Sequence, residues 1–240
     1  MQWKTTGSRE AGVGRTVIRA RTKQIRMTAT REILGTPAIA GVVALENVSW
    51  ELYELLLRDT DGQHMRITYD QGRLVLVSPL PIHEKIKKLA GRLIEMATFE
   101  LAIPVSSFGS TTWKRQDLAK GLEADECYYI QNEPSVHGRT DIDLKRDPPP
   151  DLAVEIDITH EPIDRPSVYA ALGVRELWRY DGERFAFFRR TGSENYEPIA
   201  GSETLSFMTP EIVDRFTRLM LTDENAGLRA FQQWLRSPTR

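Results

Sequence analysis

Residues 148 to 160 read Pro148-Pro149-Pro150-Asp151-Leu152-Ala153-Val154-Glu155-Ile156-Asp157-Ile158-Thr159-His160. Successive side chains of a β-strand point to opposite faces. One face would therefore carry Leu152, Val154, Ile156 and Ile158, and the other Asp151, Ala153, Glu155 and Asp157. The apolar face predicts a strand packed on a core, and the acidic face gathers carboxylates that repel one another unless cations join them. Those cations are either a divalent metal ion or neighbouring arginines on a half-exposed strand.

The composition of the whole chain is typical of a globular protein with one domain. The chain has 240 residues, of which 40% are hydrophobic and 28% are charged, and these values fit neither a disordered nor a membrane-embedded protein. The longest apolar run, Ala38 to Leu45, is too short to span a bilayer, so we expect no membrane segment. The single cysteine, Cys127, excludes a disulfide within the chain and a cysteine-rich zinc site. A chain with a single cysteine and no disulfide fits the reducing cytoplasm.

Positive charge is concentrated at the N-terminus. Residues 1 to 32 carry eight Lys or Arg against Glu10 and Glu32, a balance of +6 in a chain of net charge −2. We expect residues 1–40 to form a flexible basic arm that is either a solvated tail or a contact for phosphates. Residues 41–205 would form the main domain, and residues 206–240 a helical appendage.

Periodicity and turn residues predict the elements of the main domain. Helices are expected at 49–58, 82–102 and 166–172, followed by two more beginning at Thr209-Pro210 and at Thr222. Hairpins are expected around Asp70-Gln71-Gly72 and Asp181-Gly182. Further strands are expected at 105–108, 111–115 and 151–158, and the aromatic second half of 122–130 favours another. This order predicts an α/β (α+β) fold with a central mixed sheet flanked by helices and with helices at the C-terminus.

A second acidic residue could complete a site with the acidic strand. Asp125 stands at the start of the strand predicted just before it, and consecutive strands are usually neighbours, so its carboxylate could lie beside Glu155. Two carboxylates with open coordination positions suit Mg²⁺, which can activate a water and offset charge on a phosphodiester. Arg165 could return a positive charge to the same edge. The alternative for Asp125 is a structural role as a turn residue at the start of a strand. The alternative for His83, which lies at the start of a long helix, is a local hydrogen bond with no role in a site.

Several segments resemble the Uma2 family of restriction endonucleases, which belongs to the PD-(D/E)XK nuclease superfamily. They are Gly72-Arg73-Leu74, Ser78-Pro79, His83, Glu123-Ala124-Asp125, the run from Pro150 to Ile156, and the run from Tyr169 to Trp178. The resemblance implies a restriction-endonuclease-like core, DNA cleavage that depends on a divalent metal ion (Mg²⁺ or Mn²⁺), and a homodimer.

The family's site residues can be placed position by position. Asp125 matches the first metal aspartate, Glu155 the acidic residue of the second motif, and Asp151 the aspartate that opens that strand. Arg165 stands where the family has a lysine, and arginine cannot act as a general base because it stays protonated. Asp157 stands where the wider superfamily has a lysine. Val75 stands where many relatives carry an acidic residue.

Three functions are open at this point. The first is a Mg²⁺-dependent endonuclease in which Asp125 and Glu155 hold the metal, Asp151 and Asp157 support the acidic cluster, Arg165 stabilises phosphate and His83 assists. The second is a catalytically weak or inactive nuclease-like fold that binds nucleic acid or protein, and the third is an unrelated structural protein. If DNA is bound, basic residues should gather at the cleft; the candidates are Lys85, Lys87, Lys88, Arg92, Lys114 and Arg115.

Overall fold

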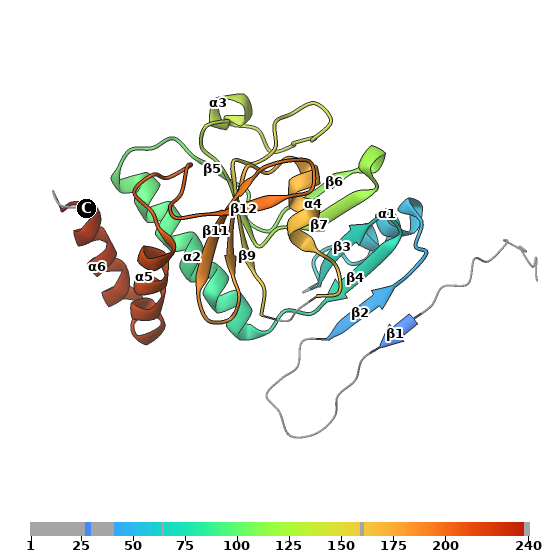
Figure 1. Cartoon of the computed structure of the whole chain (residues 1–240), viewed down its shortest axis with the longest axis horizontal. Helices are drawn as coiled ribbons and strands as arrows, with labels where there is room; N and C mark the ends of the chain where they lie inside the picture. Colours follow the sequence, from blue (N-terminus) through green and yellow to red (C-terminus); the bar gives the residue numbers. More distant parts are fainter. Residues whose placement is uncertain (1–26, 30–40, 64, 159–160, 238–240) are drawn as a thin grey trace, which may run out of the picture.

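The computed structural model describes residues 27–29, 41–63, 65–158 and 161–237. The predicted basic arm therefore lies outside the described residues, except for the three residues of strand β1. Thr159 and His160, at the end of the acidic stretch, lie outside them as well. Within the described part of the chain, the strands form two six-stranded sheets (Figure 1).

The first sheet is antiparallel throughout. Its strands follow one another in space as β1 (Met27–Ala29), β2 (Val42–Leu45), β4 (Arg73–Val77), β3 (Arg66–Asp70), β7 (Lys120–Glu123) and β6 (Thr112–Arg115). The hairpin of β3 and β4 turns at Gln71 and Gly72, which both have positive φ. This turn is the hairpin predicted around Asp70-Gln71-Gly72.

The second sheet is mixed, as predicted for the core. Its strands follow one another as β12 (Tyr196–Ile199), β11 (Phe185–Arg190), β10 (Glu176–Tyr180), β9 (Leu152–Ile156), β8 (Glu126–Tyr129) and β5 (Ser106–Ser107). Strands β9 and β10 are parallel, and the other pairs are antiparallel. The α/β fold class is thus confirmed, with two sheets where the sequence predicted one.

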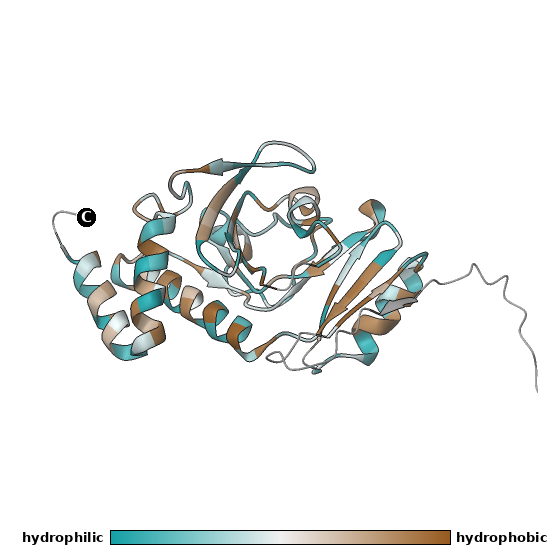
Figure 2. Cartoon of the chain, turned by 60° about the horizontal axis from the view of Figure 1, so that its bottom comes forward, coloured by the Kyte–Doolittle hydropathy of each residue, from teal (hydrophilic) through white to brown (hydrophobic). Residues whose placement is uncertain are grey.

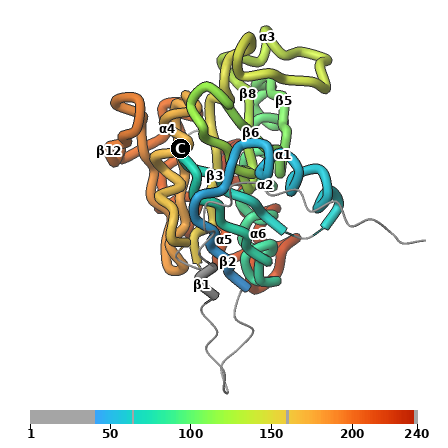
Figure 3. Tube along the Cα trace, turned by 90° about the vertical axis from the view of Figure 1, so that its right-hand side faces the viewer, coloured from blue at the N-terminus to red at the C-terminus, as the bar shows by residue number. Residues whose placement is uncertain are grey.

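Helices pack against both sheets, most of them on outer faces and α4 between the two sheets (Figure 1). They are α1 (Trp50–Asp59), α2 (Pro81–Glu100), α3 (Glu133–Val136), α4 (Arg165–Leu172), α5 (Pro210–Thr222) and α6 (Glu224–Leu235), with a short 3-10 turn at Gln116–Leu118. The Ser49 and Thr209 side chains cap α1 and α5 as their sequence positions predict. Figure 3 shows α3 at the opposite end of the molecule from β1 and β2.

The acidic strand β9 is buried on both faces. Its apolar face packs in one core with α2, α5 and α6, through residues such as Leu89, Phe216 and Phe231. Figure 2 shows α5 and α6 banded in hydrophobic and hydrophilic colours, as expected for helices that bury one side. The opposite face of β9 packs toward the first sheet and α4, in a second core that includes Ala153 and Leu177. The acidic face is therefore interior and not half-exposed.

The C-terminal helices α5 and α6 pack in the same core as β9. The division of the chain into a main domain and a helical appendage that begins at residue 206 stays a prediction. A third cluster, under α1, contains Tyr53, Ile67 and Tyr69. Because β3 alternates, its Arg66 and Thr68 point the other way, toward the second sheet. No helix in the described part of the chain is both long enough and apolar enough to cross a membrane.

Candidate active site

The candidate site lies where the chain passes from one sheet to the other. The strand predicted in the second half of 122–130 is β8, which begins at Glu126 in the second sheet, and it is preceded by β7, which ends at Glu123 in the first. Asp125 lies in this link. Strand β8 pairs with β9 so that Glu126 is opposite Val154, and the register brings Asp125 next to Glu155. The predicted neighbourhood of these two strands is confirmed.

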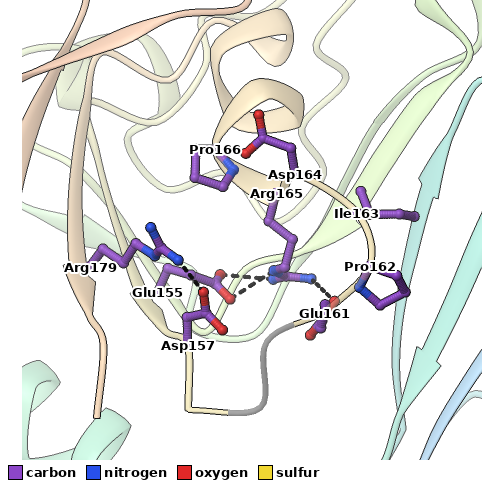
Figure 4. A pocket seen from close by; sticks show the side chains of 9 residues that line it. All are labelled: Glu155, Asp157, Glu161, Pro162, Ile163, Asp164, Arg165, Pro166 and Arg179. Carbon is purple, nitrogen blue, oxygen red and sulfur yellow. Dashed lines mark hydrogen bonds and ion pairs between the residues drawn. The ribbon is translucent and has the colours of Figure 1, made fainter. Parts of the chain in front are cut away.

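Glu155 is held by residues of α4. The guanidinium of Arg165 donates from Nε to Oε1 at 2.7 Å and from Nη2 to Oε2 at 2.8 Å, and the Tyr169 hydroxyl donates to Oε2 at 2.7 Å. The side chains of Glu155 and Arg165 are 1% and 4% exposed. Figure 4 shows Arg165 between Glu155 and Glu161. Both oxygens of the Glu155 carboxylate thus accept from protein donors, through a bidentate salt bridge and a hydroxyl.

Asp125 is held by three donors from different elements. Arg66 of β3 donates from Nη1 to Oδ1, the backbone N–H of Ile156 donates to Oδ2 at 2.7 Å, and His83 of α2 lies with Nε2 3.1 Å from Oδ2. The first turn of α2 places His83 inside the protein, where it is 1% exposed. His83, which the sequence suggested as an auxiliary residue, therefore contacts Asp125 directly.

Arg66 joins the two acids, and sequence reasoning missed it. Its Nη1 touches Asp125 and lies 3.7 Å from Oε1 of Glu155, while its Nη2 donates to Oε1 of Glu161 at 2.8 Å. Arg66 is 5% exposed. One guanidinium thus lies within reach of three buried carboxylates.

The neighbours of Asp125 and His83 shift their pKa values in opposite directions. Burial would raise the pKa of Asp125, but the positive charge of Arg66 and the hydrogen bond from His83 hold it well below its usual range. Burial would lower the pKa of His83, but the hydrogen bonds with Asp125 and Glu84 raise it to about 9. Both shifts favour the charged form, the imidazolium of His83 and the carboxylate of Asp125.

Formal charges cancel within this buried cluster. Three carboxylates (Asp125, Glu155 and Glu161) face two guanidiniums (Arg66 and Arg165) and the imidazolium of His83. Burial raises the pKa of Glu155, but the salt bridge with Arg165 favours its charged form. Buried charges are tolerated where they are paired and hydrogen-bonded in this way.

The two supporting acids predicted from the sequence lie in different places. Asp157 pairs with Arg179 beside Glu155, as Figure 4 shows. Asp151, at the start of β9, accepts from the backbone N–H groups of Ile130 and Asn132 at 2.7 and 2.8 Å, and from the Asn132 amide at 2.8 Å. Asp151 therefore serves the turn after β8 and makes no contact with the cluster among the described residues.

A cavity of about 450 Å³ opens beside the cluster. It is lined by Glu155, Asp157, Glu161, Pro162, Ile163, Asp164, Arg165, Pro166 and Arg179 (Figure 4). Carboxylates outnumber guanidiniums among these residues. Five of the six basic residues expected to bind phosphate pair with acids: Lys85 and Arg92 with Glu224, Lys87 with Glu84, Lys114 with Glu54, and Arg115 with Asp117. The sixth, Lys88, lines another cavity together with Lys87 and three glutamates.

The residues of the site do not fit a resident Mg²⁺ or Mn²⁺ ion in this arrangement. Every oxygen of Asp125 and Glu155 already accepts from a protein donor. The cluster is neutral, so a divalent ion would leave an uncompensated buried charge of +2. Val75 of β4 pairs with Thr68, whose hydroxyl accepts from Arg165. The apolar side chain of Val75 has no oxygen atom that could bind a metal ion. Among the described residues, no three His, Cys, Asp or Glu side chains are grouped to hold a metal.

Comparisons with known proteins place the chain in a family. The solved structure of a putative nuclease belonging to DUF820 from Anabaena variabilis is similar, with 10% sequence identity and a TM-score of 0.45 over 63% of this chain and 90% of that one. No curated protein matches the sequence. The family model for Uma2, described as a putative restriction endonuclease, matches residues 50–220. Since this match spans most of the chain, the protein belongs to the Uma2 family.

Proposed function

We propose that this protein is a nuclease-fold module that binds nucleic acid without hydrolysing it through a resident metal ion. This is the second of the functions expected from the sequence. The observation that supports it most strongly is the pairing of Asp125 and Glu155, because protein donors use every carboxylate oxygen that would otherwise bind a metal. Membership of a restriction-endonuclease-like family supports nucleic acid, and DNA first, as the ligand.

The chemistry of Arg165 supports the same conclusion. Its guanidinium stays protonated and is committed to Glu155, to the Thr68 hydroxyl and to the carbonyl of Glu123. It therefore cannot take a proton from water, and it cannot stabilise a phosphate without leaving Glu155 unpaired. Binding with little or no turnover is the outcome that these contacts favour.

Cleavage of supercoiled plasmid DNA under a titration of Mg²⁺ and of Mn²⁺ tests the proposal. We expect no metal-dependent nicking by the wild type. The Glu155→Gln variant, purified in the same way, measures nicking by contaminating nucleases. Metal-dependent nicking by the wild type that Glu155→Gln lacks would overturn the proposal and restore the Mg²⁺-dependent endonuclease with Asp125 and Glu155 as metal ligands.

Binding is tested separately, by fluorescence anisotropy with a labelled DNA duplex over a series of salt concentrations. Contacts with phosphates make affinity fall as salt rises. Because five of the six basic candidates in the described part of the chain pair with acids, the phosphate contacts are expected from the basic segment 1–32. Replacing Arg15, Arg19 and Arg21 with Gln should weaken binding and flatten its salt dependence. Absence of binding by the wild type at low salt would contradict the proposal. Sedimentation of the protein alone over a series of concentrations tests the predicted homodimer.

A further inference from the structure

We infer that Arg66 takes the place of a divalent cation between Asp125 and Glu155, and that a metal site forms there when its guanidinium is removed. The inference rests on the proposed function, since it supposes that the wild-type site holds no metal. It concerns a residue for which the resemblance to nucleases gives no role.

The position of Arg66 is that of a bridging cation. A single nitrogen, Nη1, touches Oδ1 of Asp125 and lies 3.7 Å from Oε1 of Glu155. The other terminal nitrogen binds Oε1 of Glu161. A metal ion shared by two carboxylates would bind an oxygen of each, at about 2.1 Å for Mg²⁺. The guanidinium thus provides the positive charge that these acids require.

Arg165 is the more firmly held of the two arginines. Its Nε, Nη1 and Nη2 all donate to oxygen atoms. The buried Nε of Arg66, in contrast, has no hydrogen-bond partner among the described residues. Its Nη1 also lies 2.9 Å from Nε2 of His83, which contacts the same Asp125 carboxylate. Arg66 is therefore the cation whose replacement leaves most of the remaining network intact.

Charge and access both favour a metal ion after this replacement. Without Arg66, three carboxylates face only Arg165 and the imidazolium of His83, so the cluster carries a net negative charge. The cavity of about 450 Å³ reaches Glu155 and Glu161 from one side. A second cavity, of about 480 Å³, is lined by Arg66 itself and by Glu123. A hydrated ion, which keeps several of its waters when it binds carboxylates, would have a way in.

Mn²⁺ binding to the full chain tests the inference, measured by the loss of the free-ion signal in electron paramagnetic resonance. We expect Arg66→Ala to bind one Mn²⁺ per chain at least about tenfold more tightly than the wild type, and Arg66→Ala combined with Asp125→Asn to lose this gain. Arg73→Ala is the matched control, because it removes a guanidinium from the paired strand of the same hairpin, where Arg73 is half-exposed and bound to Glu46. It should bind Mn²⁺ as the wild type does.

Two results would overturn the inference. One is a folded Arg66→Ala that binds Mn²⁺ no better than the wild type. The other is a wild type that already binds Mn²⁺ as tightly, at a site that Asp125→Asn removes. If Arg66→Ala does not fold, Arg66→Met, which keeps most of the side-chain volume, is measured by thermal unfolding. A variant that Mn²⁺ stabilises supports the inference, and variants that stay unfolded or unstabilised with Mn²⁺ contradict it.

The failure of the inference and the failure of the proposed function give different results. Metal-dependent cleavage by the wild type refutes the proposed function whatever Arg66→Ala binds. An inert wild type, together with a folded Arg66→Ala that has no gain in Mn²⁺ affinity, leaves the proposed function standing and refutes only the role of Arg66.

Discussion

The two ends of strand β9 bury a carboxylate in two different ways. At its start, Asp151 is satisfied by two backbone N–H groups and an amide, all from the turn after β8. Near its end, Glu155 is satisfied by a guanidinium and a hydroxyl from α4. The first arrangement uses neutral donors close in sequence, and the second uses a charged donor. The same strand thus satisfies one buried acid with neutral donors and another with a charged donor, and only the second belongs to the charged cluster.

The largest effect is expected at the charged end. Glu155→Ala leaves Arg165 buried without its partner, and breaking such a pair costs about 3–5 kcal/mol of the free energy of unfolding. Urea denaturation followed by circular dichroism measures the loss. Asp164→Ala is the control, because it removes an exposed carboxylate from the same cavity; its effect should stay within about 0.5 kcal/mol. Equal losses in the two variants would contradict the comparison.

A smaller loss is expected at the neutral end. Asp151→Asn keeps one oxygen acceptor but turns an NH₂ group toward donors that Asp151 now satisfies, which costs about 1–3 kcal/mol. The same denaturation experiment measures it. A loss greater than that of Glu155→Ala would show that the neutral donors hold their acid more strongly than the charged ones do.

The pH dependence of stability should come from the charged end. Since the folded-state pKa of His83, about 9, exceeds its ordinary value of 6.5, its contribution is fully present below pH 6.5 and is lost as the pH rises toward 9. The free energy of unfolding should therefore fall over this window. The His83→Gln variant should have a flatter profile, and identical slopes for the two proteins would rule out this role of His83.

The smallest expected effect is that of chelation. If arginines supply the positive charge at Glu155, adding EDTA to protein purified without chelator should leave the midpoint of thermal unfolding unchanged. A clear decrease, reversed by Mg²⁺, would show that the charged end depends on a metal after all.

Much of the site followed from local sequence, but Arg66 did not. The pairing of β8 with β9 was predictable because consecutive strands are usually neighbours, and Arg165 lies only ten residues after Glu155. Arg66 lies 59 residues before Asp125, on a strand of the other sheet. A hint was present in β3, where Arg66 and Thr68 alternate with Ile67 and Tyr69, because two polar residues on one strand face suggest a polar partner. Nothing in the sequence identified that partner.

The sequence predicted individual helices and turns better than it predicted how the strands assemble into sheets. Helix caps and turns depend on a few adjacent residues, so Ser49, Thr209 and the hairpin at Gly72 were recognisable. The division into two sheets depends on the link at Ala124 and Asp125, and no glycine or proline marks it. Strand β12 was missed because its four residues, Tyr196–Ile199, include Pro198 and show little alternation.

The link at Asp125 also has a consequence for how the molecule comes apart. Its carboxylate accepts hydrogen bonds from the backbone N–H of Ile156 in the second sheet and from the guanidinium of Arg66 in the first. Separating the two sheets would therefore break one of these bonds and leave a buried charge without its partner. The two sheets should consequently open together, in one cooperative step. Hydrogen exchange at the amide of Ile156 would then proceed only through global unfolding.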